Sequence, residues 1–71
     1  MSEAVKPVSA ITLAAFIFGG VSAQEANRLY TGQLRWLCLR VDAAPRKELL
    51  TMDRYRLAEL VFEHYGRKTT R

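Results

Sequence analysis

The sequence contains a single cysteine, a single histidine and two prolines among its 71 residues. Cys38 cannot form an intramolecular disulfide, and no Cys/His cluster has the spacing of a zinc site. A small domain that has neither a disulfide nor a structural zinc ion often gains stability by self-association or by docking on a larger partner. We therefore expect a homodimer or a complex, and the lone cysteine favours a reducing, cytoplasmic compartment.

Charged residues are missing from one long stretch, residues 7–24. This run resembles the apolar part of a secretory signal ending at the small residues 21–23, but Lys6 ahead of it is offset by Glu3. It is shorter than the roughly 20 apolar residues of a membrane span and is broken at residues 19–20. We interpret it as a core helix; the alternative of a small single-span membrane subunit is disfavoured by its length, and we do not expect a membrane partner.

The apolar residues of this run recur at steps of three and four, which places them on one helical face. The residues of this face are Ile11, Ala14, Ala15 and Phe18. Phe16 and Ile17 lie off that face. Because apolar side chains occupy more than one side, we expect this helix to be buried on most sides.

Basic residues are concentrated in the rest of the chain. The formal net charge is +4, and residues 28–71 carry ten Lys/Arg against five Asp/Glu. A basic protein of this kind is attracted to nucleic-acid phosphates or to an acidic protein groove, since attraction to polyanions is long-range. With 49% hydrophobic residues the chain is expected to fold rather than to remain disordered.

Three signals predict further helices. Ser22 and Glu25 form the S-x-x-E pattern of a capping box, which predicts a helix start, and Gly32 predicts its end. The apolar residues 34–41 fit either a continuation of that helix or a short strand, and we favour the helix. Thr51 is predicted to cap a last helix over residues 52–65.

The fold class that follows is all-α, a small and mostly helical bundle. One domain covers residues 1–71, with residues 1–8 and 67–71 expected to be flexible. The last helix is expected to bury an apolar arc formed by Tyr55, Leu57, Ala58, Val61, Phe62 and Tyr65.

Candidate catalytic or metal-binding residues are few. Glu59 and Glu63 share a helical face, but His64 points away from Glu63, which leaves at most two ligands. Cys38 lies in an apolar run, where cysteines usually act as small hydrophobic residues. We expect no enzyme, no metal site and no cofactor.

A polar stripe is the first candidate binding site. If the helix that begins after Ser22 continues, five polar residues fall on or beside one line along it. They are Gln24, Asn27, Arg28, Thr31 and Arg35. Arginine pairs with guanine, and glutamine or asparagine with adenine, in the major groove of DNA. The stripe therefore predicts a DNA-reading surface.

The residues around this stripe resemble a known motif. Ala14-Ala15, the glycine pair and the segment VSAQEANRLYTG are similar, over about twenty residues, to the helix-turn-helix of phage Cro-like and repressor proteins. The spacing from the alanine to the glycine and on to the next aliphatic residue departs from that family by one position. The resemblance implies a small transcription regulator that binds DNA through a helix-turn-helix-like element.

A protein-binding function is the alternative. Trp36 lies between Arg35 and Arg40, and tryptophan and arginine dominate the hot spots of protein interfaces. This profile fits a small phage-type protein that binds host RNA polymerase or another transcription factor and alters transcription. In that interpretation Arg35, Trp36 and Arg40 contact the partner.

Overall fold

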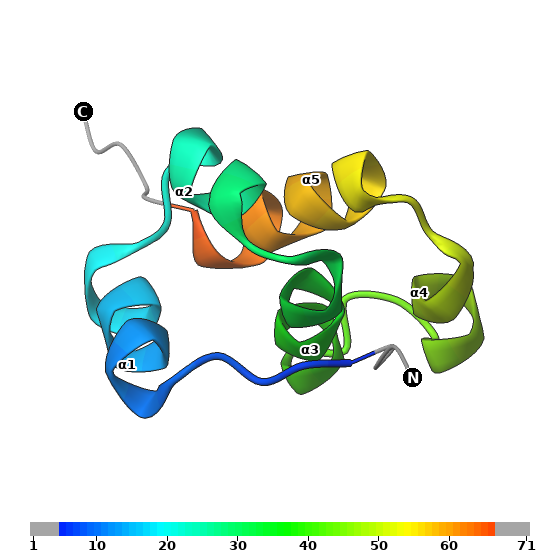
Figure 1. Cartoon of the computed structure of the whole chain (residues 1–71), viewed down its shortest axis with the longest axis horizontal. Coiled ribbons are helices and arrows are strands. Elements are labelled where there is room, and N and C mark those ends of the chain that lie inside the picture. Colours follow the sequence, from blue (N-terminus) through cyan, green and yellow to red (C-terminus); the bar gives the residue numbers. More distant parts are fainter. Residues whose placement is uncertain (1–4, 67–71) are drawn as a thin grey trace.

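The computed structural model describes residues 5–66, and within this range the chain forms five helices. They are α1 (Ala10–Gly19), α2 (Ala23–Arg28), α3 (Thr31–Arg40), α4 (Arg46–Thr51) and α5 (Arg54–Tyr65). No strand occurs in these residues, so the all-α prediction is confirmed and the strand alternative for residues 34–41 is wrong. α1 and α4 lie at opposite ends of the molecule (Figure 1).

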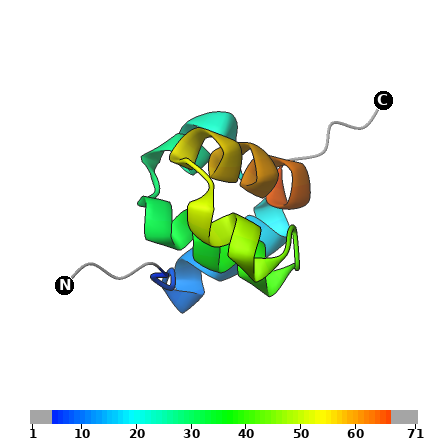
Figure 2. The same ribbon diagram turned by 90° about the vertical axis from the view of Figure 1, so that its right-hand side faces the viewer.

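The core lies between α3 and α5, which pack against each other. α2 adds to it from the side of α5, and α4 adds to it from the side of α3. Viewed from the α4 end, α5 lies across the top of the molecule and α1 is at the far end (Figure 2). The fully buried large side chains are Val21, Leu34, Leu37, Leu49, Leu57 and Val61. The Tyr65 hydroxyl donates a buried hydrogen bond of 3.1 Å to the Leu37 carbonyl, which ties the end of α5 to α3.

Local capping starts three of the helices. The predicted capping box is present, since the Glu25 amide donates to Ser22 Oγ (3.1 Å) and the Ser22 amide donates to Glu25 Oε1 (2.9 Å). Ser9 caps α1 by a single bond of this kind, since its Oγ accepts from the Thr12 amide (3.1 Å). The predicted cap at Thr51 is wrong, because its hydroxyl donates back to the Glu48 carbonyl and ends α4. Asp53 caps α5 instead, by accepting from the Arg56 amide.

The continuous helix expected after Ser22 is broken. Leu29 and Tyr30 both have extended backbones, with ψ of 152° and 153°, and they separate α2 from α3. Gly32 lies in the first turn of α3 and does not end a helix. A residue of another helix stabilises the break: Arg54 Nη2 on α5 donates to the carbonyls of Asn27 (2.6 Å) and Leu29 (3.0 Å). These carbonyls at the end of α2 would otherwise lack partners.

The predicted face of α5 is largely, but not wholly, buried. Four of its residues lie in the core: Leu57, Ala58, Val61 and Tyr65. Tyr55 and Phe62 are instead 77% and 44% exposed, and Leu60 is buried in addition. The buried face is therefore rotated slightly from the arc that the sequence predicts, because α5 is covered by both α2 and α3.

The helix α1 differs most from its expectation. Phe16 is its one buried residue, with Leu13 partly buried against the core. The predicted face points outward, with Ile11 84% and Phe18 88% exposed and Ala14 and Ala15 exposed between them. The prediction that this helix is buried on most sides is therefore wrong. Within residues 5–66, none of the helices has both the length and the apolar character needed to cross a bilayer.

Two glycines fix how α1 is joined to the rest. Gly20 ends α1 with a backbone φ of 79°, a conformation that residues other than glycine rarely adopt. Val21 then forms an isolated parallel bridge with Gly66, and its amide donates to the Tyr65 carbonyl at 2.8 Å. A Cβ atom at Gly66 would overlap the Phe62 carbonyl oxygen, so only glycine fits there.

The segment before α1 is anchored. Residues 5–8 were expected to be flexible, but the Lys6 amide donates to the Gly32 carbonyl (3.0 Å) and Val8 is buried. The Lys6 ammonium also lies 4.8 Å from the centre of the Tyr30 ring. The flexibility expected of residues 1–4 and 67–71 falls outside the described part of the chain.

Candidate functional site

The five residues of the predicted DNA-reading stripe lie on two separate helices. Gln24, Asn27 and Arg28 are exposed on α2, whereas Thr31 and Arg35 are half-buried on α3. The break at residues 29–30 removes the single helical line that would have joined them. The prediction of one continuous stripe is therefore wrong, although three of its members share the exposed side of the short helix α2.

Arg35 is engaged within the fold. Its Nε donates to the Leu49 carbonyl at 3.0 Å, across a partly buried contact between α3 and α4. Such a charge-assisted bond to a backbone carbonyl stabilises the packing of the short α4 on α3. Arg35 was expected to belong to both candidate surfaces, and in the structure it links two helices.

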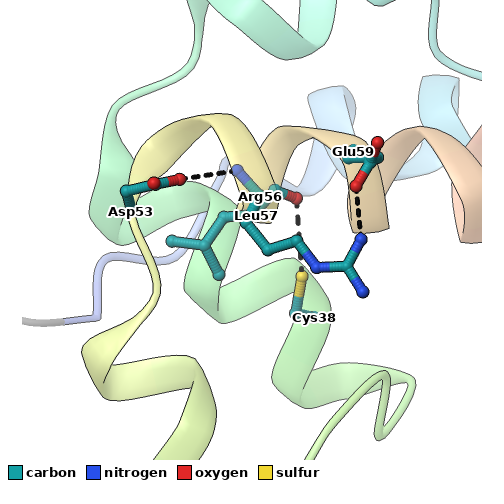
Figure 3. Close-up of polar contacts among 5 residues, drawn as sticks. All are labelled: Cys38, Asp53, Arg56, Leu57 and Glu59. Atoms are coloured by element: carbon teal, nitrogen blue, oxygen red, sulfur yellow. Dashed lines mark hydrogen bonds and ion pairs between the residues drawn. The ribbon is translucent and has the colours of Figure 1, made fainter.

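Other arginines of the basic segment also have intramolecular partners. Arg54 binds the last carbonyls of α2, and Arg56 forms an exposed ion pair with Glu59 one turn along α5 (Figure 3). The outer side of α5 is thus a mixture of both charges and not a basic stripe. The contacts of Arg35 and Arg54 are made to neutral carbonyls, so these side chains hold helices together while keeping their charge.

The helix α3 is a core helix. Leu34, Leu37 and Cys38 are buried, and Arg40 is its only exposed residue. A helix that enters a DNA groove must present a row of side chains to the bases. The second half of the predicted stripe therefore lies on a helix that exposes little of its length.

Trp36 and Arg40 remain together at the surface end of α3. The Trp36 indole is half-buried and packs against the core, and the Arg40 guanidinium lies 5.5 Å from the centre of its ring. This cation–π contact orders both side chains, one turn apart on the helix. Val41, 38% exposed, follows directly. Two of the three predicted partner-binding residues are thus adjacent and accessible.

Cys38 has the properties of a core residue. Its side chain is 1% exposed, and its Sγ lies 3.8 Å from the Leu57 carbonyl oxygen. Figure 3 draws this contact between α3 and α5. Burial raises the pKa of the thiol from its ordinary value of 9.0 to about 11. The nucleophilic thiolate is therefore scarce at neutral pH. Among residues 5–66, no group of three or more His, Cys, Asp and Glu side chains is arranged to hold a metal ion.

The outer face of α1 is a surface that the sequence pattern assigns to the core. Next to it an open hollow of about 440 Å³ lies between residues 16–20 and residues 64–66. Phe18 lies both on the exposed face and in the wall of this hollow. The helix has no charged residue on any side, so its sequence does not indicate which side faces water. That absence of charge is the one sign in the sequence that the expected orientation is not determined.

Comparisons with models of known protein families, with curated protein sequences and with solved structures found no match.

Proposed function

We propose that the protein is a small cytoplasmic regulator of transcription that acts by docking on a protein of the transcription machinery, without catalytic chemistry or a cofactor. The observation that carries this proposal is the Trp36–Arg40 pair, a half-exposed indole beneath an exposed guanidinium. A large aromatic surface that is already ordered loses little entropy on binding, and tryptophan with arginine is the commonest hot-spot chemistry.

The intramolecular contacts of the arginines favour a protein partner over DNA. Arg35 and Arg54 are bonded to carbonyls of the fold and Arg56 is paired with Glu59. Affinity for nucleic acid depends on Lys and Arg side chains that neutralise phosphates. Among residues 5–66, the other exposed cations lie on separate segments, with Lys6 before α1, Arg28 on α2, and Arg46 and Lys47 on α4. Trp36 and Arg40, by contrast, lie one turn apart on α3 and contact each other.

The test is direct capture of purified bacterial RNA polymerase by the immobilised protein after nuclease treatment. We expect the wild type to retain polymerase and Arg40→Glu to reduce its affinity at least tenfold, because the substitution reverses a charge at the contact. Arg40 is exposed, so this variant keeps its fold, which circular dichroism checks. Tyr55→Ser removes an exposed aromatic on α5 and serves as the matched control.

Polymerase that is retained only while DNA is present, or equal retention by Arg40→Glu and wild type, would contradict the docking proposal. Trp36→Ala tests the same surface with a larger expected loss, about 30-fold, corresponding to a hot-spot contribution of about 2 kcal/mol.

DNA binding is the second candidate function, and one observation favours it. Gln24, Asn27 and Arg28 are all exposed on α2, whose first turn is fixed by the capping box. In this proposal α2 presents these side chains to base edges. Arg28→Ala should then relax base preference in a randomised duplex pool, with a loss of about 1–3 kcal/mol on the preferred sequence.

The matched control for DNA binding is Lys47→Ala, which removes an exposed cation on α4. A contact to phosphate alone weakens all sequences equally and lowers the salt slope by about one unit. If the wild type has no preferred sequence, or if Arg28→Ala behaves like Lys47→Ala, base reading by α2 is ruled out.

A further inference from the structure

The outer face of α1 is an ordered apolar surface that nothing in the described chain covers. Ile11 and Phe18 are 84% and 88% exposed, and Ala14 and Ala15 are exposed between them. The helix contacts the core from its opposite side, through Phe16 and Leu13. Large contiguous apolar patches, beyond a few hundred Å², are rare on soluble monomers and mark interaction sites.

The spacing of the exposed residues has a centre of symmetry. The midpoint between Ala14 and Ala15 is equally far along the helix from Ile11 and from Phe18. When a second α1 is placed antiparallel across this midpoint, Ile11 lies opposite the partner's Phe18 and Ala14 lies opposite the partner's Ala15. Within this set of four residues, each large side chain faces a large one and each alanine faces an alanine, and the two-fold axis repeats both contacts.

We propose that α1 pairs with α1 of a second copy of this chain, antiparallel, about a two-fold axis that passes between Ala14 and Ala15. The alanines at the centre let the two helix axes approach to about 8 Å, the close end of the usual range for packed helices. Ile11 and Phe18 close the contact at its two ends. A two-fold axis makes the contact self-limiting, and twofold dimers are the commonest soluble assembly.

The electrostatics of α1 suit a second copy. Residues 7–24 contain no Asp, Glu, Lys or Arg, so two copies of this face meet without like-charge repulsion. An antiparallel arrangement also places the positive end of each helix dipole beside the negative end of the other. α4, which carries Arg46 and Lys47, lies at the opposite end of the molecule (Figure 1), so these cations of the two copies stay far apart.

The hollow beside α1 enlarges the contact. Phe18 forms part of its wall, together with Tyr65 and Gly66 at the end of α5. In the antiparallel pair the partner's Ile11 lies against Phe18, at the edge of this hollow, which gives its side chain apolar surface beyond the helix itself. A second copy therefore contacts the exposed face of α1 and the edge of the hollow together.

The small size of the contact limits its strength. A ten-residue helix is about 15 Å long, so two such helices bury less than the roughly 1,200 Å² at the lower limit of stable interfaces. The dimer is therefore reversible and dissociates on dilution. It is independent of the Trp36–Arg40 surface, since that surface lies on α3.

Sedimentation velocity over about a hundredfold range of concentration tests the dimer, because mass action makes a reversible dimer depend on concentration. We expect the weight-average mass to rise toward twice the monomer value for the wild type, and Phe18→Ser to remain monomeric. Phe18 is exposed, so the variant keeps its helical circular dichroism. Tyr55→Ser, which removes another highly exposed aromatic, from α5, should dimerise like the wild type.

Cysteine cross-linking tests the register. In Ala14→Cys the two introduced thiols lie next to the two-fold axis, and mild oxidation should link the chains. In Ile11→Cys the equivalent thiols are offset by seven residues, about 10 Å along the axis, which a disulfide cannot span. Cys38 does not compete, because it is buried and its raised pKa keeps it protonated.

Three results would overturn the proposal. They are a wild type that stays monomeric throughout, a Phe18→Ser variant that still dimerises, and Ile11→Cys cross-linking as readily as Ala14→Cys, which indicates parallel helices. Flotation of the wild-type monomer with anionic phospholipid vesicles, lost in Phe18→Ser, would instead assign the α1 face to a lipid surface.

Discussion

The helices α1 and α5 carry the same kind of apolar pattern and use it in opposite ways. In α5 the residues at steps of three and four are mostly buried, among them Leu57 and Val61 at 0% exposure. In α1 the corresponding face, with Ile11 and Phe18, points away from the core. Periodicity therefore identifies which residues share a face, but it does not decide which face turns inward.

Charge on the opposite side is what decides the orientation. The outer side of α5 carries Arg56, Glu59 and Glu63, and burying ionised groups without partners is prohibitively costly. α1 has no ionisable residue on any side, so either face can be buried. Its orientation is set by Phe16 in the core and by the turn at Gly20 that leads into the Val21–Gly66 bridge.

The comparison predicts that truncating a buried residue of α5 has the largest effect on stability. Leu57→Ala should lower the free energy of unfolding by about 3 kcal/mol, through lost burial and a cavity between α3 and α5. Ile11→Ala on α1 removes a similar apolar side chain from an exposed position and should cost less than about 0.5 kcal/mol. Urea unfolding at low protein concentration measures both, and equal losses would remove the distinction between the two helices.

The pH dependence of stability reports on the same core. Because the Cys38 thiol has a pKa near 11 when folded and about 9.0 when unfolded, the unfolded chain releases this proton first as pH rises. The contribution of this group to stability is complete below pH 9 and falls between pH 9 and 11, by about 3 kcal/mol.

Cys38→Ala is the control, since it removes the thiol but not the other groups that titrate in alkali. The difference in unfolding free energy between wild type and Cys38→Ala should therefore shift between pH 9 and 11. A difference that does not change with pH would show that Cys38 is accessible to water and that the core at this point is open.

Local features of this fold could be predicted from the sequence. The capping box at Ser22 and Glu25 involves residues three apart, so its geometry follows from the local chain alone. The all-α class follows from the helical spacing of the apolar residues. The buried part of α5 could also be predicted, because its polar side is charged and its apolar side is not.

Long-range features could not be predicted. The break at residues 29–30 has no proline or glycine in it, and Arg54, more than twenty residues later, satisfies the carbonyls that it exposes. The inward turn of Arg35 likewise depends on the Leu49 carbonyl of α4. Contacts between distant parts of the chain therefore decide both the helix boundary at residues 29–30 and the orientation of Arg35, and a local sequence pattern does not contain them.

A smaller effect is predicted at the start of α2, the helix that follows α1. Ser22→Ala removes the acceptor for the Glu25 amide and should lower the free energy of unfolding by about 1 kcal/mol. Ser22→Asp, which restores an acceptor at the cap, should recover most of that loss. Thermal unfolding of Ser22→Ala that matches the wild type would mean that this capping box does not stabilise the chain.

The most direct test of the outward orientation of α1 compares two phenylalanines that are two residues apart. Phe16 is 6% exposed and Phe18 is 88% exposed. At concentrations where the chain is monomeric, Phe16→Ala should lower the free energy of unfolding by about 3 kcal/mol. Phe18→Ala should change it by less than about 0.5 kcal/mol. A loss for Phe18→Ala equal to or larger than that for Phe16→Ala would show that α1 packs on the core through the face that carries Phe18, which would contradict the outward orientation of that face.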